Sequence, residues 1–218
     1  MIPTDKNDGL NIINQTRVMV MLSLIQKDDL NKYLEPSKVV NYNNPEIQEK
    51  VRELAGDQGQ IETAKDIYHF VRDEIDHSLD IGSCQLTCRA SEVLKEGHGL
   101  CFAKSNLLTA LLRFMEIPTG FCYQTLTHED GFVLHGLNAV YLDGKWFRLD
   151  ARGNRADVDA QFSMEQESLA FYPTVEGEKD YPYIFSQPDE GILKIIGESK
   201  SPEEVMKTLP SVLNWYTD

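Results

Sequence analysis

Cys101 stands where a thiol could act as a nucleophile. It follows Gly97-His98-Gly99 and opens a strongly apolar run whose spacing predicts a helix. A Ser, Thr or Asp is the ordinary cap at a helix start, whereas a cysteine there meets unpaired backbone N–H groups and the positive end of the helix dipole. These surroundings favour a thiolate over a thiol. The glycines would let a substrate approach Cys101 closely.

A catalytic thiolate needs a histidine to exchange a proton with, and that histidine needs a carboxylate to fix its tautomer. The histidines that compete for this role are His69, His77, His98, His128 and His135. His69 lies inside a predicted helix and His128 in the polar turn THEDG, while His98 is tied to the turn before Cys101. The pattern of strands after Pro118 favours His135.

Asp143-Gly144 is the strongest hairpin signal in the chain. It separates two runs rich in aromatic and β-branched residues, GFVLHGLNAVYL (131–142) and WFRLD (146–150). The segment GFCYQTL (120–126) has a similar strand composition. We therefore predict a two-residue turn between two antiparallel strands, with a further strand before them.

A two-residue turn also predicts which residues meet across the hairpin. Counting back from the turn places Leu137 opposite Asp150, so that His135 is a diagonal neighbour of Asp150 on the same face of the sheet. The Cβ atoms of such neighbours are roughly 7–8 Å apart, a gap that an imidazole and a carboxylate can close. The prediction depends on the length of the turn, because one extra bulge residue would place His135 and Asp150 on opposite faces of the sheet.

Each of the three residues also has a purely structural interpretation. Cys101 could be core packing, since free cysteine is among the most buried residue types. His135 could be a core histidine whose ring nitrogens are hydrogen-bonded inside the protein, and Asp150 could simply form the turn at the end of its strand. Their joint occurrence in the order Cys, His, Asp favours a catalytic triad, in which Cys101 is the nucleophile, His135 the base and acid, and Asp150 the orienting carboxylate.

The elements that must position these residues fall into two halves. Helical patterns cover residues 16–34, 45–56, 61–75 and 91–97. The helix that begins at Cys101 is apolar on nearly all sides, which is typical of a buried central helix, and antiparallel strands follow it. This order predicts an α+β fold, in which a helical N-terminal half packs on an antiparallel sheet.

The chain shows no repeat and no linker, so we expect a single domain over residues 1–218. Within it, residues 1–33 form an N-terminal helical extension. Residues 171–218 form an irregular, Pro-containing tail that ends in a short helix capped by Ser201. Tyr181, Tyr183 and Phe185 of this tail could shape a rim over the cleft, although packing of these aromatics on the core is favoured.

Composition restricts the partners and the location of the protein. Lys and Arg number 21 against 35 Asp and Glu, a net charge of −14, which disfavours binding to nucleic acid or to an anionic membrane. The most apolar run, residues 18–25, is far shorter than the ~20 residues that a membrane helix needs. The N-terminus shows no secretion signal, so we expect a cytoplasmic protein with reduced cysteines. The sequence leaves the oligomeric state open.

A metal site is not favoured. Cys84 and Cys88 are separated by three residues, and His77 lies seven residues before Cys84, which falls short of a convincing zinc pattern. The chemistry expected of Cys101 needs neither a metal nor an organic cofactor. We therefore expect no cofactor.

Three stretches of the chain closely resemble the transglutaminase-like superfamily, in particular its compact bacterial single-domain members: IYHFVRDEIDHS, ASEVLKEGHGLCFAKSNLLTALLRFMEIPTGFCYQ and VLHGLNAVYLDGKWFRLDARGN. The resemblance runs over about residues 34–196 and implies a papain-like core with a Cys-His-Asp triad. Cys101, His135 and Asp150 stand at the matching positions. Many members have His-Ala-Trp where this chain has His135-Gly136-Leu137, so a large aromatic beside the base is missing.

The reaction that the resemblance implies is acyl transfer from a peptide or side-chain amide through a thioester. Hydrolysis by a protease or amidase is favoured over amine transfer, because water is always present. The backbone N–H of Cys101 is a natural oxyanion donor. Candidates for a second donor are Gln85, Tyr123, Gln124 and Asn138. The alternatives are a transglutaminase or other acyltransferase with the same triad, and a non-catalytic protein-interaction module that retains the fold.

Overall fold

The computed structural model describes residues 22–128 and 131–213. The α-helices are α1 (Pro45–Leu54), α2 (Gln60–Asp73), α3 (Ala90–Glu96), α4 (Cys101–Phe114), α5 (Glu190–Glu198) and α6 (Pro202–Thr208), and η1 (Leu30–Leu34) is a 3-10 helix. The strands are β1 (Ile25–Gln26), β2 (Asp76–His77), β3 (His98–Gly99), β4 (Thr119–His128), β5 (Gly131–Leu142), β6 (Lys145–Leu149), β7 (Lys179–Asp180) and β8 (Tyr183–Ile184). Four helices precede the long strands, so the α+β prediction is confirmed.

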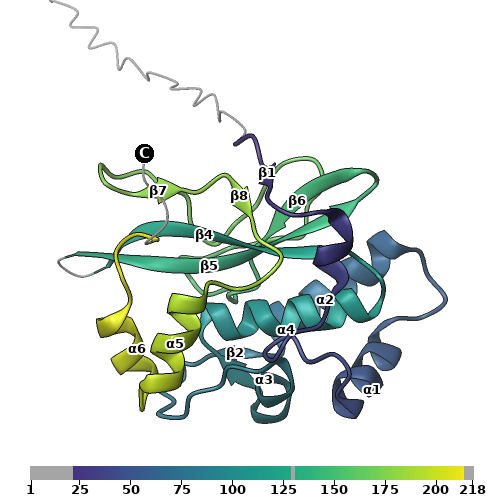
Figure 1. The fold of residues 1–218 in the computed structure, drawn as a ribbon, viewed down its shortest axis with the longest axis horizontal. Helices are drawn as coiled ribbons and strands as arrows, with labels where there is room; N and C mark the ends of the chain where they lie inside the picture. The colour runs from purple at the N-terminus through teal and green to yellow at the C-terminus, as the bar shows by residue number, and fades with distance from the viewer. Residues whose placement is uncertain (1–21, 129–130, 214–218) are drawn as a thin grey trace, which may run out of the picture.

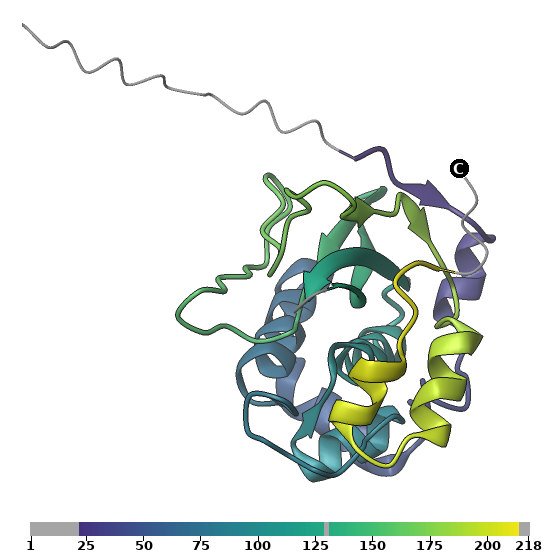
Figure 2. The same ribbon diagram turned by 90° about the vertical axis from the view of Figure 1, so that its left-hand side faces the viewer.

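One antiparallel sheet with the strand order β6-β5-β4-β7 forms a layer of the molecule. Helix α4 runs along one face of this sheet, and α1, α2 and α3 pack around α4 on the side away from the strands (Figure 1). Helices α5 and α6 lie beside each other at one end of the molecule (Figure 2). The opposite face of the sheet carries a second, smaller apolar cluster that includes Tyr33, Leu137 and Ile184.

The turn between β5 and β6 has the predicted length of two residues. Asp143 and Gly144 have φ of 48° and 77°, the backbone that a tight hairpin with right-handed strand twist requires. Leu142 pairs with Lys145, and the ladder continues without a bulge to Asn138 and Leu149. The register prediction is therefore confirmed, and Asp150 follows directly after the last residue of β6.

Helix α4 is buried from Cys101 to Arg113, because it packs on the sheet on one side and on three helices on the other. Two of its polar side chains donate to backbone carbonyl groups of other segments. The Arg113 guanidinium donates to the carbonyl oxygen of Thr119 from Nε at 3.1 Å and Nη2 at 2.7 Å, and Asn106 Nδ2 donates to the carbonyl oxygen of Cys88 at 2.9 Å. These bonds hold the helix in one position, which is what a reactive group at its first residue requires.

Gly136 allows α4 to approach β5 closely. A Cβ atom at this position would lie 2.6 Å from Cδ1 of Phe102, the residue that follows Cys101. That distance is shorter than van der Waals contact, so an alanine could be accommodated only if the Phe102 ring moved. The glycine at position 136 is therefore matched to the aromatic ring at position 102.

The prediction of a helix over residues 16–34 is wrong for the part that the structure describes. Residues 16–21 lie outside the described residues, and the remainder forms β1 and η1 instead. The backbone here bonds to β8 and its neighbour: Ile25 N donates to Pro182 O at 2.7 Å, and Lys27 N donates to Ile184 O at 3.2 Å. Pairing with the tail thus replaces the helical bonds that the apolar pattern alone favours.

The tail is more ordered than the sequence predicts. Besides the short helix capped by Ser201, which is α6, it contains β7, β8 and α5. Tyr181 is fully buried, and Phe185 forms an antiparallel bridge with Phe121 of β4. Tyr181 and Phe185 thus pack on the core, as the favoured prediction has it. Residues 214–218 lie outside the described residues.

Replacing Gly136 with alanine tests the contact between α4 and β5. We expect Gly136→Ala to lower the free energy of unfolding by roughly 1–3 kcal/mol, since the new methyl group overlaps the buried Phe102 ring. Urea unfolding followed by circular dichroism measures the loss. Gly131→Ala is the matched control on the same strand, because among the described residues no atom lies within 4 Å of a Cβ there. Equal stability of the two variants would contradict the overlap.

Candidate active site

Cys101 is the first residue of α4, and Leu100 is the N-cap. In the described part of the chain no side chain caps this helix, so the backbone N–H groups of its first turn are not bonded by a cap residue. Cys101 is 8% exposed and lines a cavity of about 1630 Å³. The prediction that Cys101 begins a buried helix is confirmed.

His135 and Asp150 form a buried pair beside this cavity. His135 Nε2 lies 2.8 Å from Asp150 Oδ2, and the two residues are 5% and 1% exposed. The diagonal placement that the hairpin register predicts is therefore confirmed. His135 also lines the cavity with Cys101. Because Nε2 bonds to Asp150, Nδ1 is the ring nitrogen left to exchange a proton with the thiol.

Electrostatic interactions at the site determine the protonation states of His135 and Asp150. Burial opposes protonation of His135, but the charges of Asp150 and Cys101 and hydrogen bonding to both outweigh it and raise the pKa of His135 to about 10. Burial likewise opposes the charged form of Asp150, and His135 together with backbone N–H groups lowers the pKa of that carboxyl. An imidazolium beside the Asp150 carboxylate is therefore the stable state of His135 at neutral pH.

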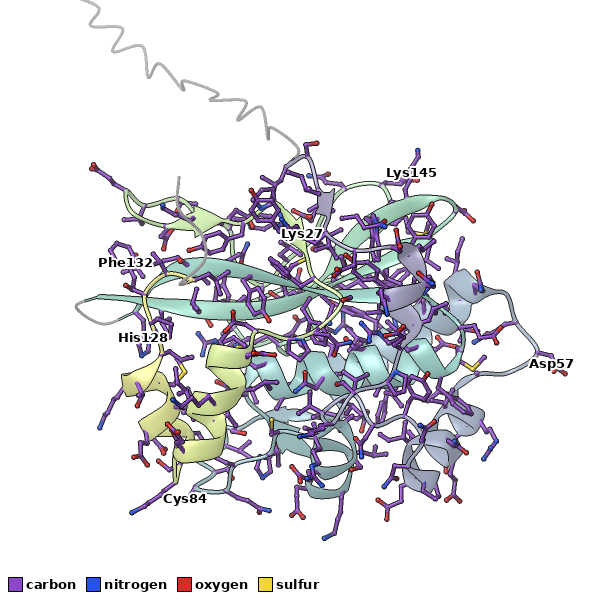
Figure 3. The ribbon with its side chains drawn as sticks, in the orientation of Figure 1. Lys27, Asp57, Cys84, His128, Phe132 and Lys145 are labelled. Atoms are coloured by element: carbon purple, nitrogen blue, oxygen red, sulfur yellow. The ribbon has the colours of Figure 1, made fainter. Side chains whose placement is uncertain are left out.

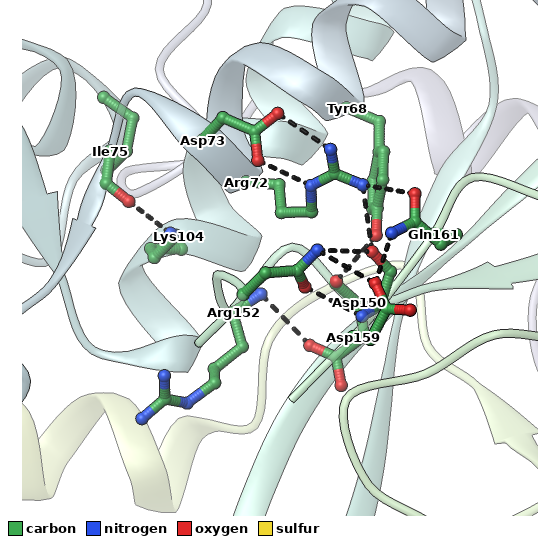
Figure 4. A network of polar contacts seen from close by, with 11 residues as sticks. Tyr68, Arg72, Asp73, Ile75, Lys104, Asp150, Arg152, Asp159 and Gln161 are labelled. Carbon is green, nitrogen blue, oxygen red and sulfur yellow. Dashed lines mark hydrogen bonds and ion pairs between the residues drawn. The ribbon is translucent and has the colours of Figure 1, made fainter. Parts of the chain in front are cut away.

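Asp150 is held by backbone donors on both sides. Oδ1 accepts from Arg152 N at 3.1 Å, and Oδ2 accepts from Ala170 N at 3.2 Å as well as from His135. The Tyr68 hydroxyl from α2 donates to the carbonyl oxygen of Asp150 at 3.0 Å (Figure 4). These contacts leave the carboxylate one orientation, with an oxygen directed at His135.

Residues 167–172 form a segment over this pair, here called the strap. Arg148 of β6 anchors it: the buried guanidinium donates to both carboxylate oxygens of Glu167 at 2.7 Å and also bonds to Asp180 of β7. Hydrogen bonds to Glu167 and Asp180 outweigh burial and raise the pKa of Arg148, which stays charged. The strap is thereby tied to the strand that leads directly into Asp150.

Phe171 of the strap supplies an aromatic ring beside the base. Its ring meets that of His135 edge-on, with centroids 5.2 Å apart and an interplanar angle of 89°. Phe171 also lines the cavity. The large aromatic missing after His135 in the sequence is thus provided from about 35 residues further along the chain. No signal within the strap region indicated this contact, because it arises from the folding of an irregular segment.

The other histidines fall into different environments. His98 lies beside the hydroxyls of Ser78 and Ser83, 3.0 Å from Nδ1 and 3.2 Å from Nε2, so both its ring nitrogens have partners. His69 is half-buried on α2. His128 stands at the end of β4, at the opposite end of the sheet from Lys145 (Figure 3). His135 differs from these three in its 2.8 Å contact with a buried carboxylate.

His77 is a polar residue of this cavity that the sequence does not assign to the site. It lines the cavity together with Cys101 and His135, and it is 8% exposed. None of the four residues considered as a second oxyanion donor lines this cavity in the described part of the chain. Asn138 instead donates to Thr109 Oγ1 at 2.9 Å, on the face of β5 that packs against α4. A buried histidine in a two-residue strand gives no periodic pattern by which sequence could have found it.

Two further charged side chains lie next to the site. Arg152 is 7% exposed and donates to both oxygens of Asp80, at 2.5 and 2.7 Å. Lys104, one turn after Cys101 on α4, directs Nζ to the carbonyl oxygen of Ile75 (Figure 4). Burial, and then the charge of Arg152, lowers the pKa of Lys104 to about 7.

The remaining cysteines are separate from the cavity. Cys84 is exposed, whereas burial raises the pKa of Cys88 to about 11 and that of Cys122 to about 12. Among residues 22–128 and 131–213, no group of three or more His, Cys, Asp or Glu side chains could hold a metal ion. Within these same residues, no helix has the length and apolarity needed to span a membrane.

Removing Arg148 tests how the strap is anchored. We expect Arg148→Met to lower the free energy of unfolding by about 3 kcal/mol, because it leaves Glu167 and Asp180 facing each other without a cation. Arg155→Met is the control, since the exposed pairs of Arg155 contribute within about 0.5 kcal/mol. Thermal and urea unfolding measure both. Equal stability of the two variants would contradict the anchoring role.

Three solved structures are similar to parts of the chain. One is a proposed cysteine protease from Cytophaga hutchinsonii, with a TM-score of 0.48, 19% identity and coverage of 60% of this chain and 46% of that one. The second is a proposed protease from Parabacteroides distasonis, with a TM-score of 0.38, 17% identity and coverage of 55% of this chain and 24% of that one. The third is a protein described as a TGase, with a TM-score of 0.40, 14% identity and coverage of 80% of this chain and 52% of that one. The chain spans about half or less of the length of these structures. No curated protein matches it significantly.

A comparison with protein families gives a match to the transglutaminase-like superfamily over residues 48–151. The matched segment begins in α1 and ends one residue after Asp150, so it contains α4 and the β5–β6 hairpin. Cys101, His135 and Asp150 all lie inside it. Residues 48–151 therefore match the model of the transglutaminase-like superfamily.

Proposed function

We propose that the protein is a cysteine-dependent acyl-transfer enzyme that hydrolyses peptide or side-chain amides through a thioester, with Cys101, His135 and Asp150 as its triad. One observation carries the proposal: a histidine hydrogen-bonded at 2.8 Å to a buried carboxylate lines the same cavity as a cysteine at a helix start. Cysteine nucleophiles are activated by this combination of histidine and helix N-terminus. The superfamily match is consistent with it.

In the first half of the reaction, the Cys101 thiolate attacks the carbonyl carbon of the amide and a C–S bond forms. The carbonyl electrons move to oxygen, where the backbone N–H of Cys101 can stabilise the negative charge. Collapse of this intermediate breaks the C–N bond. His135 gives its proton to the leaving nitrogen, and a thioester remains on Cys101.

In the second half, His135 is neutral and accepts a proton from water as the water oxygen attacks the thioester carbonyl. The C–S bond then breaks, the carboxylic acid leaves, and the thiolate and imidazolium are restored. Asp150 keeps the ring oriented throughout, because its own oxygens are fixed by Arg152 N and Ala170 N. Hydrolysis is favoured over amine transfer because exposed polar side chains, among them Arg155, Glu165 and Gln166, line the cavity and give water access.

The cavity supports a peptide or protein as the substrate. Its volume of about 1630 Å³ exceeds what a small metabolite fills. Apolar side chains from β4, β5 and the strap line it beside the charged ones, including Leu126, Val133 and Phe171. A chain segment that carries an amide next to apolar side chains would match such a surface.

Product analysis tests the reaction. We expect incubation with a peptide library and a labelled primary amine to give peptide cleavage or ammonia release without uptake of the label, since water resolves the thioester. Mass spectrometry and an ammonia assay measure the products. Cys101→Ala is the control and should form none of them. Label uptake would assign the protein as a transglutaminase, and absence of every product with all peptides tested would favour the interaction module.

The pH dependence of two reactions tests the ion pair. At pH 6 we expect iodoacetamide to alkylate Cys101 faster than an ordinary thiol with a pKa of ~8.5, and His135→Ala to remove this advantage. Amide turnover should fall as pH rises through about 10, because His135 then loses the proton that the leaving nitrogen needs, while alkylation continues. Peptide mass spectrometry assigns alkylation to Cys101, with exposed Cys84 as the internal reference.

Unfolding has to be separated from this effect. The pKa of His135 is raised from 6.5 in the unfolded chain to about 10 in the folded protein. The protonated ring therefore stabilises the folded state fully below about pH 6.5, and this stabilisation is lost as the pH rises to about 10. Circular dichroism at each pH shows whether the protein is still folded. Turnover that stays constant above pH 10 in folded protein would contradict the role of His135 as the acid.

A further inference from the structure

His77 is held beside the start of α4 by a short parallel strand pair. In the pairing of β2 with β3, His77 lies opposite Gly99, two residues before Cys101. Paired residues share a face of a ladder. A Cβ atom on Gly99 would lie 3.0 Å from Ala103 Cβ and 3.5 Å from Lys104 N, which places that face against the first turn of α4. The side chain of His77 therefore projects on the side where the helix begins.

The His77 ring is buried without complete hydrogen bonding. Its Nδ1 atom has no hydrogen-bond partner among the described residues. The nearest carboxylate oxygen, Asp80 Oδ1, is 4.0 Å away and already accepts from Arg152. Buried polar atoms are rarely left in this state, so such an atom calls for an explanation. His98 shows the ordinary arrangement in the same region, with a serine hydroxyl at each ring nitrogen.

The surroundings keep the His77 ring uncharged. Burial, and then the positive charge of Arg152, lower the pKa of His77 to about 3, although Asp80 acts in the opposite sense. Lys104 and His135 also disfavour a charge on the ring. A neutral imidazole has one N–H donor and one acceptor. Enzymes use a neutral histidine near a helix N-terminus to polarise a carbonyl group without giving up its proton.

We propose that His77 is the second hydrogen-bond donor of the oxyanion hole, beside the backbone N–H of Cys101. This inference rests on the proposed acyl-transfer function. When the C–S bond forms, negative charge appears on the carbonyl oxygen, and the His77 N–H donates to that oxygen. When the C–N bond breaks, the charge returns to the carbonyl and the hydrogen bond weakens. His77 keeps its proton throughout, and proton transfer stays with His135.

Two substitutions at position 77 separate this role from others. His77→Phe keeps a ring but removes the N–H, and we expect kcat for thioester formation to fall by roughly 10²–10³. His77→Gln restores a neutral donor and should recover much of the loss. Rapid-quench mass spectrometry of the Cys101 thioester, with a p-nitrophenyl ester and a peptide amide as probes, measures the rate. Circular dichroism checks the fold, and His77→Met replaces His77→Phe if the latter is unfolded.

Alkylation by iodoacetamide provides the second readout. This displacement at a methylene carbon creates no oxyanion, so its rate at Cys101 should be unchanged in His77→Phe. His69→Phe is the matched control, because His69 is half-buried on α2 and is not among the described residues that line the cavity. We expect the control to leave both rates unchanged.

The outcomes are distinct. Thioester formation at the wild-type rate in folded His77→Phe would overturn the proposal. An equal fall in alkylation and in thioester formation would also overturn it, because His77 would then act by supporting Cys101. Failure of the proposed function would appear earlier, as absence of any thioester on Cys101 in the wild-type protein with both probes.

Discussion

Two residues with positive φ, Asp143 and Gly144, hold β5 and β6 in a register that decides which side chains share each face of the sheet. Side chains alternate along a strand, so a shift of β6 by one residue against β5 would move the Asp150 carboxylate away from His135. The same register leaves Gly136 to face α4, where Phe102 fills the space. The position of the base, its carboxylate and the nucleophile's helix thus depend on one tight turn.

Burying charge at this site is possible because each charged group has fixed partners. His135 lies against Asp150, Arg152 against Asp80, and Arg148 against Glu167 and Asp180. Unpaired, such groups would cost several kcal/mol each in a medium that excludes water. The pairs also join the segments together, since each one links a strand of the sheet, or the chain just beyond it, to another element.

The sequence predicts the parts of the site that depend on local patterns. The helix start at Cys101 follows from glycines and apolar spacing, and the His135–Asp150 contact follows from strand alternation and turn chemistry. Phe171 and His77 could not be found in this way, since a folded irregular segment and an isolated two-residue strand have no period. The N-terminal error has a related cause: an apolar pattern does not reveal that distant tail residues compete for its backbone hydrogen bonds.

Phe102 and Gly136 are the chain neighbours of Cys101 and His135, and they touch each other. The packing of this ring against the glycine backbone is therefore one of the contacts that set how closely α4 approaches β5 beside the site. Neither side chain takes part in the proposed chemistry, so a change at either position would alter the relative placement of nucleophile and base without removing a reacting group.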